Sequence, residues 1–218
     1  MELIARGREA DVYALDESKV LRRYRHGGPT DLESRLMTHL EACGFPVPKV
    51  YDITDTDMVL ERLTGPTMLD VLARRPWQVS ALGRVLGGLH DRLHALPAPA
   101  WLPKRFSTAD DDRILHLDLH PDNVVLTRRG PVVIDWCTAG AGDPAADVAM
   151  TLVTVGSADV PGLTARLGRG LLLRAVRRGS LTDPAGRIHE VAEAKLAAPY
   201  LTPSEAAWLR RCAAGASC

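Results

Sequence analysis

The sequence predicts an α+β fold of two lobes, a small β-rich N-terminal lobe and a mainly helical C-terminal lobe that carries a β-hairpin insert. Short β-type runs dominate residues 1–63, and a second group of such runs lies within 113–136. After residue 144 the apolar residues recur at helical spacing. These observations place the lobe boundary between residues 63 and 64, so the expected lobes are 1–63 and 64–218.

The N-terminal elements follow from their residue types and from the breaks between them. Alternating and β-branched residues predict strands at 11–15, 19–24, 47–54 and 57–63. Apolar residues at helical spacing predict one helix, with Thr30 or Asp31 as its N-cap and Gly44 as its stop.

The C-terminal elements begin with two helices, at 68–75 and 79–96, followed by a proline-rich loop. Three short β-type runs come next, at 113–117, 123–127 and 132–136. The remaining periodic segments predict helices at 145–155, 163–177, 188–197 and 203–213.

Composition excludes several classes of function. The 27 Lys and Arg residues balance 27 Asp and Glu residues, and aromatic residues make up 5% of the 218, so we expect neither a nucleic-acid nor a membrane partner. The cysteines form no CxxC pair, and the N-terminus lacks the pattern of a signal peptide. We therefore expect a cytoplasmic protein, and the sequence does not predict its oligomeric state.

One constellation points to chemistry, namely His116-x-Asp118-x-x-x-x-Asn123 followed by Asp135 at the end of a β-type run. In-line phosphoryl transfer needs a carboxylate that accepts the proton of the attacking hydroxyl, and hard oxygen ligands for Mg²⁺ on the nucleotide phosphates. Asp118 suits the first task, whereas Asn123 and Asp135 suit the second.

Two other interpretations of these residues are weaker. A single Asp or Asn in a loop is usually a turn former or a cap, but the ordered set of four residues on β-type segments favours a site. His116 and His120 have the i, i+4 spacing of metal ligands on a helix, yet Pro121 and the β-type flanks argue against a helix there.

The segment "ILHLDLHPDNVVL…GPVVIDWCTAGAGDPAADVA" resembles the catalytic core of the aminoglycoside phosphotransferase and choline-kinase-like family of small-molecule kinases, which share a protein-kinase-like fold. The resemblance implies transfer of the γ-phosphoryl group of ATP or GTP to a hydroxyl of a small molecule, with Mg²⁺. It implies that Asp118 is the catalytic base and that Asn123 and Asp135 bind the metal. It also implies that His116 and Asp147 support the catalytic loop.

The same resemblance assigns the N-terminal lobe to nucleotide binding. The family has a strand lysine that contacts the nucleotide phosphates and pairs with a helix glutamate, and the matching residues are Arg22 and Glu33. Arginine in place of lysine is a departure, because its planar fork has a different geometry. Glu61 and Leu63 match the hinge, whose backbone is expected to meet the adenine edge.

The acceptor stays open at this stage. Residues 151–218 hold nine basic and five acidic residues, so they offer no trap for a polycation such as an aminoglycoside. The acidic cluster Asp110–Asp112 is better explained as a solvated loop than as a binding site for a cation. A nucleotide-binding pseudokinase or regulatory module without turnover is the alternative function, whereas a protein kinase is disfavoured because no Ala-Pro-Glu segment follows Asp135.

Overall fold

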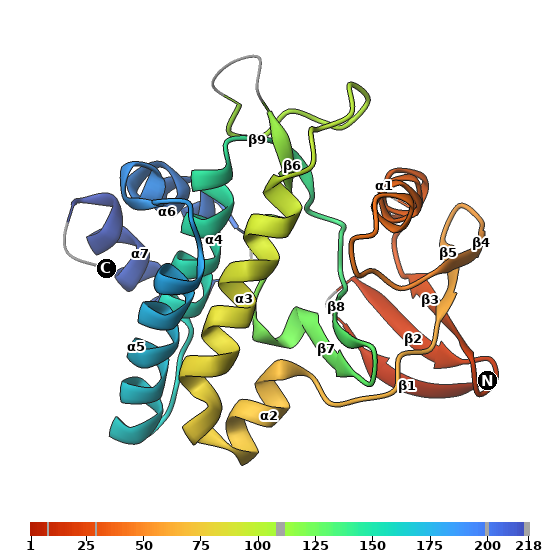
Figure 1. Cartoon of the computed structure of the whole chain (residues 1–218), viewed down its shortest axis with the longest axis horizontal. Helices are drawn as coiled ribbons and strands as arrows, with labels where there is room; N and C mark the ends of the chain where they lie inside the picture. The colour runs from red at the N-terminus through yellow and green to blue at the C-terminus, as the bar shows by residue number, and fades with distance from the viewer. Residues whose placement is uncertain (8, 29, 108–111, 199–200, 216–218) are drawn as a thin grey trace. The chain divides into compact units, whose positions relative to one another are not determined.

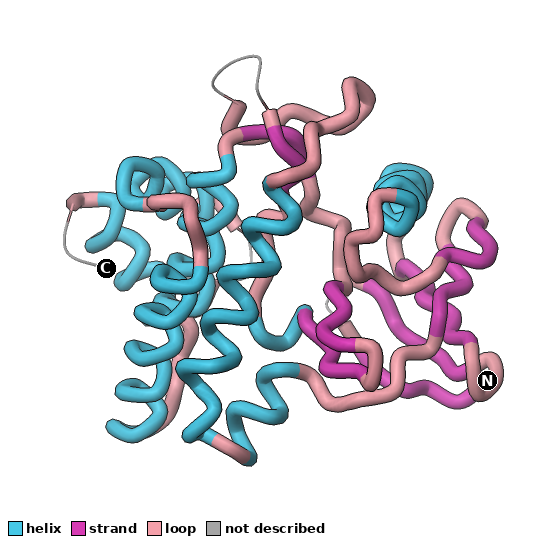
Figure 2. Tube along the Cα trace, viewed as in Figure 1, coloured by secondary structure: helices cyan, strands magenta, loops and turns pink. Residues whose placement is uncertain are grey.

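The α+β fold is confirmed by a computed structural model, which describes residues 1–7, 9–28, 30–107, 112–198 and 201–215 (Figure 1). Strands concentrate at the N-terminal end of the chain and helices make up most of the rest, as Figure 2 shows. The chain forms two compact units, here called unit 1 (Met1–Thr67 and Asn123–Thr138) and unit 2 (Met68–Asp122 and Ala139–Cys218), and each is described by itself.

Unit 1 is built on an antiparallel five-stranded sheet with the order β1-β2-β3-β5-β4. Its strands are β1 (Glu2–Arg6), β2 (Ala10–Ala14), β3 (Lys19–Tyr24), β4 (Val50–Ile53) and β5 (Asp57–Glu61). The sequence analysis missed β1, because all five of its residues are exposed and an edge strand with no buried face lacks alternation.

Helix α1 (Thr30–Ala42) contacts β4 and β5. Its apolar residues Leu36, Met37 and Leu40 are buried, as is Met58 of β5. The helix ends before Gly44, whose φ of 75° is the left-handed conformation that glycine adopts without a steric penalty. The same helix face that builds this core carries the buried Glu33.

The hairpin of β7 (Val124–Thr127) and β8 (Gly130–Val133) belongs to unit 1 although it lies far along the chain. The Leu126 N–H donates to the carbonyl of Pro66 over 2.9 Å, and Val133 N–H donates to the carbonyl of Pro46 over 2.8 Å. A Cβ at Gly65 would lie 2.1 Å from the Leu126 carbonyl oxygen, so only glycine fits this approach. This grouping rests on contacts, and the functional lobes 1–63 and 64–218 stay a prediction.

Unit 2 is mainly helical. Its helices are α2 (Met68–Arg74), α3 (Val79–His94), α4 (Pro144–Ser157), α5 (Gly162–Gly179), α6 (Ile188–Leu196) and α7 (Pro203–Ala213). A two-stranded sheet pairs β6 (Arg113–Leu115) with β9 (Gly140–Gly142), and the sequence analysis missed β9 because Gly-Ala-Gly has no strand preference. Within the described part of the chain, no helix has both the length and the apolar character that crossing a membrane requires.

Helices α3 and α5 run side by side in unit 2 (Figure 1). Two neighbouring glycines of α3 differ in what surrounds them. A Cβ at Gly87 would lie 2.6 Å from the Val176 carbonyl oxygen and 2.6 Å from the Gly179 carbonyl carbon, whereas a Cβ at Gly88 would meet nothing within 4 Å. The close approach of the two helices therefore depends on Gly87 and not on Gly88.

These glycines give a matched pair for a stability test. We expect Gly87→Ala to lower the free energy of unfolding by about 1–3 kcal/mol, because the added methyl group must push backbone atoms apart. Gly88→Ala should raise it by up to about 1 kcal/mol, because alanine is the better helix former. Urea denaturation followed by circular dichroism measures both changes, and equal effects of the two substitutions would contradict the packing described.

Candidate functional site

The predicted site residues are divided between the two units. Unit 2 holds the predicted catalytic base and the predicted loop supports, which are Asp118, His116 and Asp147. Unit 1 holds the predicted metal and nucleotide residues, which are Arg22, Glu33, Glu61, Leu63, Asn123 and Asp135. The chain passes from unit 2 to unit 1 between Asp122 and Asn123, so the geometry of each half is given separately.

In unit 2 the loop that carries Asp118 is held by a buried carboxylate. Asp147, in the first part of α4, accepts hydrogen bonds from the backbone N–H of His116 (3.1 Å) and of Leu117 (2.6 Å). Leu117 has a φ of 62°, a left-handed conformation that a branched residue adopts only where the surroundings impose it. Asp147 thus fixes the backbone turn immediately before Asp118.

Two histidines of α3 complete the surroundings of Asp147. His94 Nε2 lies 3.0 Å and His90 Nδ1 3.3 Å from Asp147 Oδ2, and all three side chains are buried. Burial by itself would raise the pKa of the Asp147 carboxyl, but the proximity of His90 and His94 holds that pKa well below its usual value. His90, His94 and Asp147 have the composition of a metal site. The Asp147 carboxylate, however, already accepts hydrogen bonds from the loop backbone, so we assign these residues to the support of the loop.

A second contact from α4 fixes the other side of the loop. The Thr151 hydroxyl donates to the carbonyl of Leu119 over 2.7 Å, and Thr151 Oγ1 lies 2.9 Å from His90 Nε2. Since the hydroxyl proton is directed to Leu119, the His90 Nε2–H is the donor of this second bond. Asp147 and Thr151 are one helical turn apart, so one face of α4 holds the loop before and after Asp118.

The side chain of Asp118 is one-third exposed at 33%, unlike those of its supports. The Asp118 N–H donates to His116 Nδ1 over 3.2 Å, and His120 Nε2 lies 3.6 Å from Asp118 Oδ2. A carboxylate on a fixed backbone, with part of its surface open to solvent, can accept a proton from a bound hydroxyl group.

In unit 1 the side chain of Arg22 bridges two carboxylates. Nη1 lies 2.7 Å from Glu33 Oε1, and Nη2 lies 2.6 Å from Asp135 Oδ1. Burial alone would lower the pKa of the guanidinium, but the charges of Glu33 and Asp135 raise it above its ordinary value. The neighbouring Arg23 points to the other face of β3 and pairs with Asp57.

Glu33 has a fully buried side chain that accepts hydrogen bonds from three donors. Besides Arg22, it accepts from the Tyr24 hydroxyl over 2.5 Å and from the Trp136 backbone N–H over 3.0 Å. Burial raises the pKa of its carboxyl, and the charge of Arg22 and the bond from Tyr24 counteract that rise in part. Asp135 also lies near enough to repel the carboxylate, so Arg22 is the cation that lets both acids lie together.

Asp135 and Asn123 lie at the same end of the β7–β8 hairpin. The Ile134 N–H donates to the Asn123 carbonyl over 3.0 Å, which fixes the two segments next to each other. Asp135 has a φ of 65°, and its side chain is 38% exposed. A carboxylate and an amide oxygen on neighbouring segments fit Mg²⁺, which prefers hard oxygen ligands, and their roles as ligands stay a prediction.

The hinge residues follow β5. Glu61 N–H donates over 2.9 Å to the carbonyl of Lys49, the residue before β4, and its side chain accepts from Arg129 over 2.7 Å. Leu63 is half-buried, two residues before Gly65. Their contact with a nucleotide base stays a prediction.

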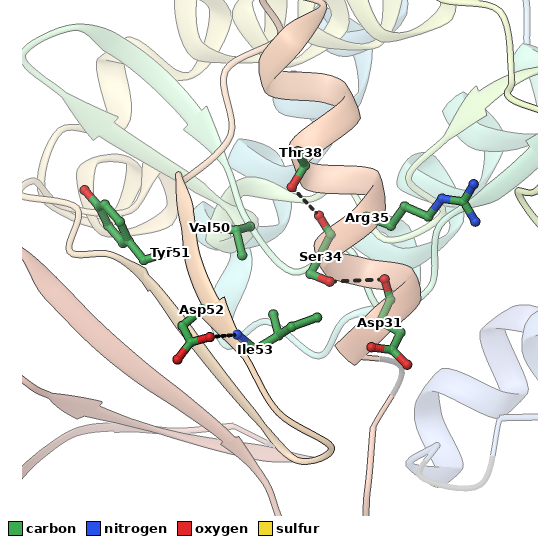
Figure 3. Close-up of a pocket in the computed structure, with 8 residues that line it drawn as sticks. All are labelled: Asp31, Ser34, Arg35, Thr38, Val50, Tyr51, Asp52 and Ile53. Carbon is green, nitrogen blue, oxygen red and sulfur yellow. Dashed lines mark hydrogen bonds between the residues drawn. The ribbon is translucent and has the colours of Figure 1, made fainter.

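A groove of about 590 Å³ lies in unit 1 between α1 and β4 (Figure 3). It is lined by Asp31, Ser34, Arg35, Thr38, Val50, Tyr51, Asp52 and Ile53, none of them a predicted site residue. Several of its polar groups form hydrogen bonds to near neighbours in the chain: Ser34 donates to the Asp31 carbonyl, Thr38 to the Ser34 carbonyl and the Ile53 N–H to Asp52.

Of the acidic cluster predicted at Asp110–Asp112, Asp110 and Asp111 lie outside the described residues. Asp112 accepts a hydrogen bond from Ser107 over 2.8 Å.

Sequence reasoning assigned His90 and His94 only to packing and capping, and it gave no role to Thr151, Tyr24 or Cys137. His90, His94 and Thr151 support the loop of Asp118, and Tyr24 and Cys137 contact the acids of unit 1. The i, i+4 spacing of His90 and His94 places them on one helix face, which was visible in the sequence. Their partner Asp147 is 53 residues from His94, and no local pattern reveals such a contact.

Comparisons with solved structures identify proteins of the same fold. First, the fold is that of small-molecule kinases. The aminoglycoside phosphotransferase APH(4)-Ia aligns with 19% identity and a TM-score of 0.67, over 97% of this chain and 91% of that one. A choline/ethanolamine kinase family protein from Mesorhizobium loti aligns with 16% identity and a TM-score of 0.64, over 98% and 86%. Amicoumacin kinase hAmiN aligns with 18% identity and a TM-score of 0.57, over 96% and 85%.

The family itself is shown by sequence. The model of the phosphotransferase enzyme family, APH, matches residues 1–113 and 91–181. The chain therefore belongs to this phosphotransferase family, and the predicted relationship to aminoglycoside phosphotransferases is confirmed. No curated protein sequence matches the chain.

The support that Asp147 gives to the loop of Asp118 can be tested through stability. We expect Asp147→Asn to lower the free energy of unfolding at pH 7 by about 3 kcal/mol, because the amide replaces a buried, paired carboxylate. Since the pKa of Asp147 is depressed in the folded protein, its contribution is present above the pKa of the unfolded chain, about 3.9, and is lost as pH falls through the folded value.

Urea unfolding of both proteins from pH 7 to pH 3 measures this dependence, and the difference between them should shrink toward the acid end. The exposed Asp183→Asn is the control, with an expected change within about 0.5 kcal/mol. An Asp147→Asn protein as stable as the wild type at pH 7 would contradict the anchoring role.

Proposed function

We propose that this chain transfers the γ-phosphoryl group of ATP or GTP to a hydroxyl group of a small molecule. The family is one of phosphotransferases, and the observation that carries the proposal is the support of Asp118. Its backbone turn is fixed by a buried carboxylate while its own side chain stays partly exposed. A purely structural aspartate needs no such support, whereas a base must meet its hydroxyl at a defined position.

The roles of the other residues follow from their chemistry. Asp118 accepts the proton of the acceptor hydroxyl as its oxygen bonds the γ-phosphorus, while the bond from that phosphorus to the β,γ-bridging oxygen breaks and the nucleoside diphosphate leaves. Asn123 and Asp135 hold Mg²⁺, which when bound neutralises the phosphate charge. Arg22, oriented by Glu33, contacts the α- and β-phosphates, and the backbone at Glu61 and Leu63 meets the adenine edge.

The ligands of similar structures support a nucleotide and a small-molecule acceptor. The hAmiN structure is a complex with AMP-PNP, Ca²⁺ and Ami. A thermostable D198A mutant of APH(4)-Ia is a ternary complex with ADP and hygromycin B. The acceptor of this chain is best sought in a panel that includes both cationic and neutral alcohols, because residues 151–218 are not acidic overall.

The role of Asp118 gives a direct test. We expect Asp118→Asn to lower turnover by about 10²–10⁴-fold, because the amide cannot accept the proton. Affinity for Mg·ATP should not change, because the carboxylate acts on the acceptor. Release of nucleoside diphosphate over the acceptor panel measures turnover, and a thermal-shift titration with Mg·ATP measures binding.

The exposed neighbour Asp122→Asn serves as the control and should keep wild-type turnover. Equal losses in both variants would argue against a base at Asp118. Tight binding of Mg·ATP by the wild type, with no turnover on any acceptor, would instead favour the pseudokinase.

A further inference from the structure

The bridge made by Arg22 has a consequence for metal binding. Its two terminal nitrogens each bond a different carboxylate, Nη1 that of Glu33 and Nη2 that of Asp135. A lysine could bond both carboxylates only from one nitrogen, whereas the arginine fork bonds each of them from a separate nitrogen, and this fork distinguishes the chain from the lysine pattern. Arg22 is therefore bonded to the carboxylate that the proposed function assigns to Mg²⁺.

The charges make the bridge a competitor of the metal. One guanidinium faces two carboxylates, so the three groups carry a net charge of −1, and the Arg22 side chain is only 14% exposed. Asp135 Oδ1 also accepts from the Cys137 thiol over 3.2 Å. A divalent cation that binds Asp135 competes with Arg22 for the charge of this carboxylate, because two cations beside one carboxylate repel each other.

The same reasoning applies to the nucleotide. A phosphate that binds Arg22 draws Nη2 away from Asp135 and leaves that carboxylate beside Glu33 without its cation. A metal alone or a nucleotide alone therefore breaks the bridge without replacing both partners. When the two ligands bind together, the metal binds Asp135 and the phosphate binds Arg22. The free-energy cost of breaking the Arg22–Asp135 ion pair is then shared between the two binding events, so each ligand favours the other.

We propose that Arg22 occupies the metal-binding carboxylate of Asp135 in the ligand-free protein, and that metal and nucleotide displace this ion pair together. The inference rests on the proposed function in one respect, since it takes Asp135 as the metal ligand. It makes Arg22 a positioning residue that couples two ligands, in addition to its contact with phosphate.

The test uses Mn²⁺ as the probe and the full chain without nucleotide, with binding followed by electron paramagnetic resonance. We expect Arg22→Met and Arg22→Lys to bind Mn²⁺ about tenfold more tightly than the wild type, the equivalent of about 1.4 kcal/mol. Arg22→Lys keeps a cation beside the buried Glu33, so it carries the test if Arg22→Met does not fold.

Arg23→Met is the matched control. Arg23 is the next residue on β3, but it pairs with Asp57 on the other face and is 47% exposed. It should bind Mn²⁺ as the wild type does, and Asp135→Asn should abolish binding. In a second titration, ADP should tighten Mn²⁺ binding more in the wild type than in Arg22→Met, because only the wild type contains the Arg22–Asp135 ion pair that the two ligands displace.

Two outcomes would overturn the inference. Mn²⁺ affinity in both Arg22 variants that equals or falls below the wild-type value would show that Arg22 does not compete at Asp135. Binding that survives Asp135→Asn would place the metal elsewhere. The proposed function is tested separately from this inference. If the Arg22 variants change Mn²⁺ binding as expected but the wild type turns over no acceptor, the inference holds and the proposed phosphotransfer is wrong.

Discussion

In each unit the predicted site residues depend on one kind of interaction, a buried carboxylate that accepts a backbone N–H next to a predicted site aspartate. In unit 2 Asp147 accepts from Leu117, the residue before Asp118. In unit 1 Glu33 accepts from Trp136, the residue after Asp135. Both turns contain a non-glycine residue in the left-handed conformation: Leu117, whose own N–H donates to Asp147, and Asp135, which directly precedes the N–H of Trp136. The buried acids thus hold two turns that the backbone would not adopt unaided.

The buried carboxylates are tolerated because each is surrounded by donors. A buried ion without partners is strongly destabilising, and the penalty falls only when hydrogen bonds and an opposite charge replace the lost water. His90 and His94 lie against Asp147, while Arg22 and Tyr24 bond Glu33. Hydrogen bonds within such a buried network strengthen one another and help to fix its geometry. Asp118 and Asp135, the predicted base and the predicted metal ligand, are more exposed than the acids that support them.

Much of the fold could be predicted from the sequence, and the exceptions have physical reasons. Helices such as α1 and α3 were found because one face of each buries regularly spaced apolar residues. Strand β1 was missed because it is fully exposed, and β9 because two of its three residues are glycine. For the site, the spacing from His116 to Asp135 indicated the chemistry, but nothing near Asp147 in the sequence indicated His90 or His94.

The sequence by itself determined the family, the α+β fold and the order of the chemical groups, because periodicity and motif spacing are local properties of the chain. The tertiary structure alone decided which charges meet. Arg22 and Asp135 are 113 residues apart, and their ion pair exists because β3 and the end of the β7–β8 hairpin belong to the same compact unit. A residue type predicts that a charge will need a partner, but only the packing of distant segments selects that partner.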